Sequence, residues 1–154
     1  MPRPVAGHGM VYLCTTYMKS ELLAITLPTK TGAEPTIAWR SKKSIPNMPS
    51  PLLVGEELYL VHDNGVASCL DAKTGREHWS QRLGGKFCSS PLYADGKIYI
   101  GNREGETVVL RPGTTFEKTA VNKLDGEIMA APMALDDGLY VRTDKALYKL
   151  ALPK

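Results

Sequence analysis

A short pattern recurs four times along this 154-residue chain: a proline, a turn, and then a strand with a central tyrosine. The three clearest copies are SPLLVGEELYL at 50–60, SPLYADGKIYI at 90–100 and APMALDDGLYV at 131–141. The prolines that open the four copies are Pro4, Pro51, Pro91 and Pro132, so the period is about 40 residues. Periods of ~40–45 residues with several short strands per repeat are typical of β-propeller blades.

Each repeat is long enough for four strands. In the second repeat we predict them at 51–54, 58–61, 66–71 and 76–83. The turns between them contain the glycines that tight hairpins need, at Gly55, Gly65 and Gly75. Since no window of 11–18 residues keeps the apolar spacing of a helix, we predict an all-β chain.

The whole chain, 1–154, is therefore predicted to be a single partial β-propeller of about four four-stranded blades. Its units are predicted at approximately 4–43, 50–83, 90–124 and 131–152, and the last unit lacks its outer strand. The second strand of each unit is apolar on both faces, as in 58–60 and 98–100, which is typical of a strand covered on both sides. The proline that opens each unit suits an innermost edge strand. A β-sandwich remains the alternative.

Charge and cysteine content exclude several classes of function. The net charge is only +3, and beyond the basic stretch at 40–43 the basic and acidic residues alternate, so we predict no nucleic-acid binding. No run of ~18 apolar residues predicts a membrane span, and the N-terminus lacks the apolar core of a signal peptide. Cys14, Cys69 and Cys88 lack CxxC spacing and suit small buried apolar positions. The sequence also allows one disulfide among them.

The end of the second repeat carries the most specific motif in the chain, CLDAKTGREHW at 69–79. It resembles the repeat of the PQQ-like (pyrroloquinoline quinone, quinoprotein-type) β-propeller family, A-x-D-x-x-T-G-x-x-x-W, with cysteine in place of the first alanine. The matching residues are Asp71, Thr74, Gly75 and Trp79. The amino-acid sequence most resembles the C-terminal part of uncharacterised bacterial, planctomycete-type members of this family.

The other repeats keep less of this motif. The first has Lys30-Thr31-Gly32 and Trp39, with a three-residue insertion between them, and the third has only Gly113 and Phe116. The turn residues are expected to satisfy backbone groups, and the glycine to take a positive φ. The tryptophan is expected to pack on the next blade and to bury ~150–250 Å². We therefore interpret Asp71, Thr74, Gly75, Trp79, Gly32 and Trp39 as a structural blade motif.

The resemblance implies two functions. The first is a non-catalytic scaffold or a protein- or ligand-binding surface in a periplasmic or extracytoplasmic parent protein. The alternative is part of an alcohol or sugar dehydrogenase that depends on the quinone PQQ and on calcium.

We predict no catalytic, cofactor-binding or metal-binding residues. Calcium needs about 6–8 oxygen ligands, whereas the acidic pairs at 56–57 and 136–137 fall in hairpin turns. A triad of His62 and Asp63 with Ser68, Ser89 or Ser90 can be composed from the sequence, but no G-x-S-x-G elbow supports it.

The last repeat raises the question of how the ring is completed. Only Met1–Arg3 precede the first strand, too few to supply an outer strand of ~5–6 residues. Three possibilities remain: a larger propeller of seven or eight blades, two copies paired into one ring, or four blades closed as a monomer. We expect a protein partner or self-association to complete the propeller.

Overall fold

The computed structural model describes residues 2–16 and 19–151, which form fifteen antiparallel strands in four sheets, with no helix in these ranges. Blade 1 comprises β1 (Val5–Gly7), β2 (Met10–Thr15), β3 (Glu21–Thr26) and β4 (Thr36–Ser41). Blade 2 comprises β5 (Leu52–Val54), β6 (Glu57–Val61), β7 (Val66–Asp71) and β8 (Glu77–Arg82). Blade 3 comprises β9 (Leu92–Ala94), β10 (Lys97–Gly101), β11 (Glu106–Arg111) and β12 (Glu117–Lys123). The described part of blade 4 comprises β13 (Met133–Leu135), β14 (Gly138–Arg142) and β15 (Leu147–Leu150).

Each sheet is a simple meander in which neighbouring strands along the chain pair with one another. Tight hairpins join the first two strands. In blade 3 the hairpin residues Asp95 and Gly96 have φ of 47° and 68°, the two positive values of a type I′ turn. The predicted all-β propeller class is confirmed.

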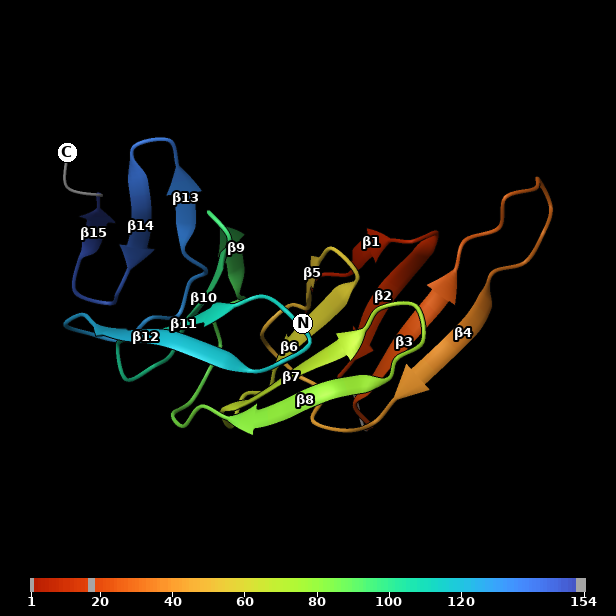
Figure 1. Ribbon diagram of the computed structural model, residues 1–154, viewed down its shortest axis with the longest axis horizontal. Coiled ribbons are helices and arrows are strands. Elements are labelled where there is room, and N and C mark those ends of the chain that lie inside the picture. Colours follow the sequence, from red (N-terminus) through yellow and green to blue (C-terminus); the bar gives the residue numbers. More distant parts are fainter. Residues whose placement is uncertain (1, 17–18, 152–154) are drawn as a thin grey trace.

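The blades follow one another along an arc, from blade 1 (red and orange) to blade 4 (blue) (Figure 1). The inner strand β1 lies against β5, and β5 lies against β9. Blades 1, 2 and 3 therefore pack sheet face against sheet face, and the hydrophobic cores lie between these blades.

Two such cores are closed. Core 1–2, between blades 1 and 2, contains Tyr12, Leu22, Leu58, Leu60 and Leu70, each at most 4% exposed. Core 2–3, between blades 2 and 3, contains Tyr59, Trp79, Phe87, Ile98 and Leu110. These residues explain the apolar second strands: one side of the strand faces the preceding blade and the other faces the following one.

The first three blades share one irregularity, a β-bulge at the same place between the third and fourth strands. The residue of the fourth strand opposite this place is Trp39 in blade 1 and Trp79 in blade 2. In blade 3 it is Ala120. Phe116, the aromatic residue that the sequence offers in the third repeat, precedes β12 and takes a different place.

The structure also shows the state of the cysteines and whether any helix could cross a membrane. Cys14, Cys69 and Cys88 are all free thiols. Burial raises the pKa of Cys14 and of Cys69 to about 12. Within residues 2–16 and 19–151, no helix has the length and apolar character to cross a membrane.

Candidate functional site

The motif turn of blade 2 is held by its own side chains. The carboxylate Oδ1 of Asp71 accepts hydrogen bonds from the backbone N–H of Thr74, at 2.8 Å, and from its hydroxyl, at 2.7 Å. The N–H of Gly75 donates to the carbonyl of Asp71 at 2.8 Å. The bonds from Thr74 hold the pKa of the Asp71 carboxyl below its usual range, so the turn is most stable with this carboxyl ionised.

Trp39 of blade 1 lies on this turn. Its indole Nε1 donates to the carbonyl of Ala72 at 3.0 Å. A Cβ built on Gly75 would stand only 2.6 Å from Cε3 of Trp39. Glycine is therefore required at position 75 both for its φ of 73° and for the close approach of the indole.

Trp79 of blade 2 makes the corresponding contact with blade 3. Its Nε1 donates to the carbonyl of Gly113 at 3.1 Å, and its ring meets that of Phe116 edge to face at 5.1 Å. The hydroxyl of Tyr59 accepts the N–H of Gly113 at 2.7 Å. The structure thus joins each tryptophan to the turn of the following blade.

The corresponding connection of blade 1, residues 27–35, is longer than the five-residue turn of blade 2, and its glycine is open. Gly32 lies in the connection between β3 and β4 with φ 83°, but a Cβ built on it would meet nothing within 4 Å. In the described ranges, therefore, the indole that covers Gly75 has no counterpart over Gly32.

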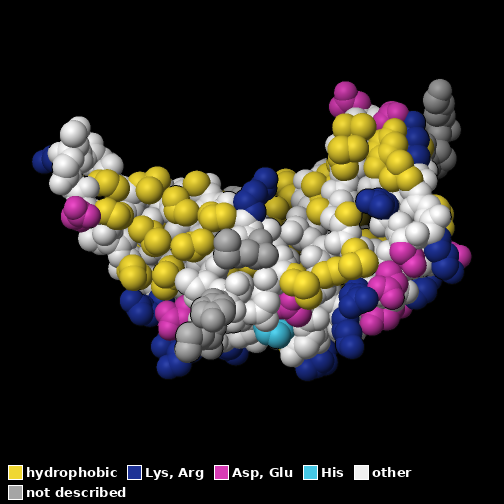
Figure 2. All heavy atoms as spheres, turned by 180° about the vertical axis from the view of Figure 1, so that it is seen from behind, with side chains coloured by type: hydrophobic (Ala, Val, Ile, Leu, Met, Phe, Trp, Pro, Cys, Tyr) yellow, Lys and Arg dark blue, Asp and Glu magenta, His cyan; other side chains and the backbone are white. Residues whose placement is uncertain are grey.

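The sheet face beside that turn is also uncovered. We call Val11, Leu13 and Ile25 the blade 1 outer face; each is only partly buried. Their register equivalents in blade 2 are Leu58, Leu60 and Leu70, which blade 1 buries to 4% exposed or less. Figure 2 shows hydrophobic side chains gathered over blade 1, to the left of that view. Together with Gly32, this face is our candidate functional site.

A second type of contact, between a blade and the connection that leads into it, was missed by sequence reasoning. The turn between the second and third strands presents a carboxylate that accepts a backbone N–H from the connection leading into that blade. The three pairs are Asn47 to Asp63 at 2.7 Å, Lys86 to Glu104 at 3.0 Å and Glu127 to Asp144 at 2.7 Å. The available signal was an acidic residue 12 or 13 positions after the proline of the second, third and fourth units.

Most residues of the possible triad are held in separate contacts. Asp63 binds Asn47 through Oδ2, and the Nδ1 of His62 accepts the N–H of Asn64 at 3.1 Å. The hydroxyl of Ser89 donates to the carbonyl of Gly101, and that of Ser90 accepts the N–H of Ser50. Ser68 is 3% exposed. The structure does not bring these residues together as a hydrogen-bonded triad.

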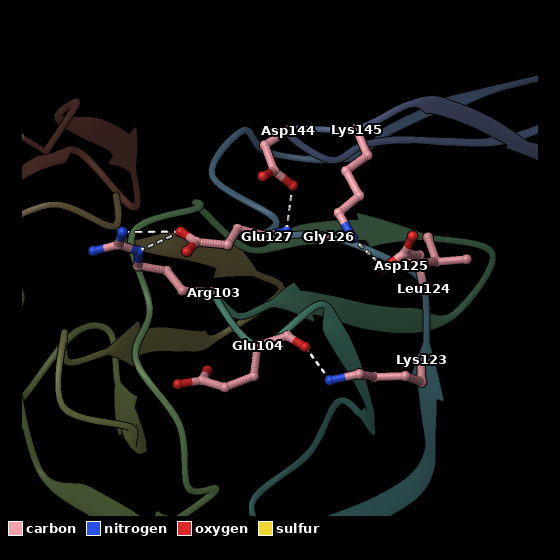
Figure 3. Close-up of a pocket in the computed structure, with 9 residues that line it drawn as sticks. All are labelled: Arg103, Glu104, Lys123, Leu124, Asp125, Gly126, Glu127, Asp144 and Lys145. Atoms are coloured by element: carbon pink, nitrogen blue, oxygen red, sulfur yellow. Dashed lines mark hydrogen bonds and ion pairs between the residues drawn. The ribbon is translucent and has the colours of Figure 1, made fainter.

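The turns between the second and third strands of blades 3 and 4, together with the connection between these blades, line a polar groove of about 640 Å³ (Figure 3). Arg103 forms an ion pair with Glu127 through Nη2 at 2.9 Å, and Lys145 forms one with Asp125 at 2.8 Å. Lys123 donates to the carbonyl of Glu104.

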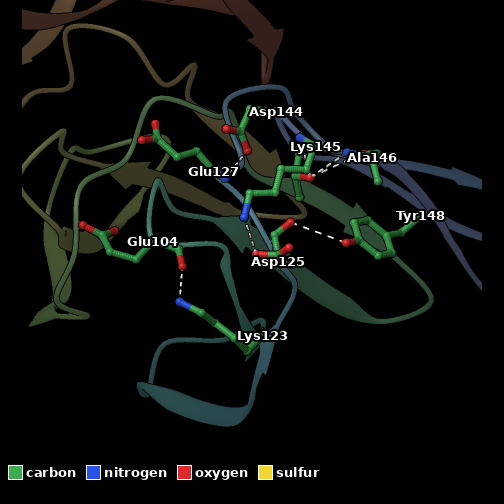
Figure 4. A network of polar contacts seen from close by, with 9 residues as sticks. Glu104, Lys123, Asp125, Glu127, Asp144, Lys145, Ala146 and Tyr148 are labelled. Carbon is green, nitrogen blue, oxygen red and sulfur yellow. Dashed lines mark hydrogen bonds and ion pairs between the residues drawn. The ribbon is translucent and has the colours of Figure 1, made fainter.

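Figure 4 shows this network extending to Tyr148, whose hydroxyl donates to the carbonyl of Asp125 at 3.4 Å. Exposed ion pairs of this kind contribute ~0–1 kcal/mol each. Each cation that lines the groove lies beside an oxygen acceptor of the same groove. Among the described residues, no group of three His, Cys, Asp or Glu side chains is placed to hold a metal ion.

Comparisons with known proteins agree with this architecture. Residues 29–128 match the family model described as "Outer membrane protein assembly factor BamB". The protein of that name from Marinobacter adhaerens is 29% identical over 91 residues, which cover 59% of this chain and 23% of the relative. The chain spans about a quarter of the length of the curated relatives it matches.

Solved structures show the same fold. The crystal structure of BamB from Moraxella catarrhalis superposes with a TM-score of 0.68 at 21% identity, over 86% of this chain and 39% of that one. A europium-containing methanol dehydrogenase superposes with a TM-score of 0.60 at 17% identity, over 81% and 24% of the two chains. Because the family model covers most of the chain, the chain belongs to the PQQ-like repeat family, the family of outer membrane protein assembly factor BamB.

Proposed function

We propose that this chain is a non-catalytic propeller module that acts as a scaffold and binds protein, as part of a ring of seven or eight blades. The observation that carries this proposal is the blade 1 outer face. It repeats, position by position, the side of blade 2 that another blade covers, and it lies beside an open turn at Gly32. The partner it fits is therefore another blade of the same repeat type.

The chemistry of that partner follows from the two closed cores. It presents an apolar sheet face to Val11 and Leu13, and a tryptophan on its outermost strand reaches Gly32. At each of the two internal interfaces the corresponding indole, of Trp39 or of Trp79, donates one hydrogen bond to a backbone carbonyl. The partner blade belongs either to the same polypeptide or, without the tryptophan contact because Trp39 and Trp79 already dock internally, to a second copy of this chain.

The family supports an extracytoplasmic parent protein with protein partners. The relatives that match are named for the assembly of outer membrane proteins. The likeness to the methanol dehydrogenase, at 17% identity, supports the fold alone.

Self-association tests the docking face. At high concentration, size-exclusion chromatography with light scattering is expected to show a dimer of the 16.8 kDa chain. Leu13→Glu places a charge at the centre of the blade 1 outer face and is expected to restore the monomer, since a buried charge without a partner is costly. Val121→Glu, at a 47% exposed position on β12, is the matched control and is expected to stay dimeric. A monomeric unmodified chain would contradict the paired ring.

A separate measurement tests the absence of catalysis. The chain is incubated with PQQ and Ca²⁺, desalted, and assayed for dye reduction with methanol and with glucose. We expect no retained quinone absorbance and no dye reduction. Stoichiometric retention of the quinone together with alcohol- or sugar-dependent dye reduction would instead establish the dehydrogenase alternative.

A further inference from the structure

The third interface between blades is not closed like the first two. A cleft of about 840 Å³ separates blade 3 from blade 4. Tyr99, Thr107 and Asn122 line it from blade 3, and Leu139 and Leu150 line it from blade 4. Clefts of ~300–1,000 Å³ with mixed apolar and polar walls are the usual size of ligand sites.

The cleft lies where a core would be expected. Tyr99 is the register equivalent of Tyr59, which belongs to core 2–3. Leu139 and Leu150 are register partners in blade 4, as Ile98 and Leu110 are in blade 3. Ile98 and Leu110 belong to core 2–3. The walls of a core are therefore present, and the space between them is open.

The reason is a missing ring. Core 2–3 is filled by Trp79, packed against Phe116 and Tyr59. In blade 3 the register position of Trp79 is taken by Ala120, which has only a methyl group. The aromatic side chain that closes the two preceding interfaces is thus absent from the described part of the third.

A polar group in the cleft also lacks the partner that its equivalent has. The hydroxyl of Tyr59 accepts a backbone N–H from the following blade, from Gly113. Among the contacts of the described residues, the hydroxyl of Tyr99 has no such hydrogen bond, although the side chain lines the cleft. It can accept an N–H from a bound segment, as Tyr59 does.

The rim of the cleft is slightly acidic. Three carboxylates line it, those of Asp95, Asp136 and Asp137, against the ammonium groups of Lys97 and Lys149. Lys97 lies 3.7 Å from Asp95, and Lys149 pairs with Asp137. Within the described ranges Asp136 has no ion pair, so the rim favours a basic group over an acidic one.

We propose that this cleft binds an aromatic side chain, carried on an extended segment of a partner protein and flanked by a basic residue. The ring takes the place that an indole fills in core 2–3, the hydroxyl of Tyr99 accepts an N–H from the segment, and the basic residue meets Asp136. This site lies at the opposite end of the described arc from the blade 1 outer face, and the proposal does not depend on that face.

Peptide titrations followed by amide NMR spectra test the proposal. The probes are Ac-Gly-Arg-Trp-Thr-Gly-NH2, the same peptide with alanine for tryptophan, and the same peptide with glutamate for arginine. The tryptophan peptide is expected to shift the amides of Thr107, Gly138, Leu139 and Leu150. The alanine peptide is expected to bind at least about tenfold more weakly, because it lacks the buried ring, and the glutamate peptide severalfold more weakly. Equal affinity of the tryptophan and alanine peptides, or shifts confined to other surfaces, would overturn the proposal.

Two variants tie the binding to the cleft. Asn122→Trp fills it from an exposed position and is expected to weaken binding at least tenfold, whereas Val121→Trp, on the opposite face of β12, is expected to leave it unchanged. Retained affinity in a folded Asn122→Trp protein would overturn the assignment. If that variant does not fold, Tyr99→Phe decides: about threefold weaker binding supports the proposal, and unchanged affinity contradicts the assigned hydrogen bond.

Discussion

Replacing Trp79 by alanine is expected to lower the free energy of unfolding by about 3–5 kcal/mol, the range for buried Trp→Ala changes. Trp79 is 8% exposed, and its indole packs on two aromatic rings. It also donates the hydrogen bond that ties blade 2 to Gly113. Its removal therefore leaves a cavity in core 2–3, and the carbonyl of Gly113 keeps only the weak thiol donor of Cys69, at 3.7 Å. Urea unfolding followed by far-ultraviolet circular dichroism measures the loss.

Trp39→Ala is the matched comparison. Trp39 makes the same kind of hydrogen bond, to Ala72, but it is only partly buried. Its loss is therefore expected to cost less than the loss of Trp79. Equal costs for the two substitutions, or a cost below about 1 kcal/mol for Trp79→Ala, would show that the indole does not hold the blades together.

Much of this architecture was predictable because the sequence repeat shows where each blade begins. The spacing of the prolines and tyrosines predicts the number of blades. The apolar faces of 58–60 and 98–100 predict that these strands are covered on both sides. Both follow from local rules of strands and turns, which a single repeat already obeys. The all-β propeller could therefore be derived before any contact was known.

The contacts between blades were harder to predict, for physical reasons. The hydrogen bond from Lys86 to Glu104 joins a backbone N–H to a carboxylate in a turn of variable sequence, and such a bond leaves no apolar pattern. Phe116 could be taken for a weak copy of the motif tryptophan, but the strand register places Ala120 at that position. The cleft follows from this one substitution, and only the strand register reveals it.

Gly75 in the docking turn of blade 2 and Gly32 in the connection of blade 1 allow a matched test of how an indole selects glycine. Gly75 and Gly32 have similar positive φ values, 73° and 83°. Trp39 covers Gly75, whereas the space above Gly32 is open. Gly32→Ala is expected to cost about 1 kcal/mol, the strain of an L-residue in this conformation. Gly75→Ala is expected to cost about 2–4 kcal/mol, because overpacking against the ring adds ~1–3 kcal/mol.

A double-mutant cycle assigns the difference to one contact. In a Trp39→Ala background the ring no longer opposes the new methyl group at position 75, so Gly75→Ala is expected to cost about as much as Gly32→Ala. The coupling energy between positions 39 and 75 should then be on the order of 1–3 kcal/mol, as expected for residues in contact. A coupling near zero would mean that backbone strain alone selects glycine at position 75. In that case the glycine at position 32 would not indicate a docking site, and the open turn of blade 1 would no longer support a partner blade.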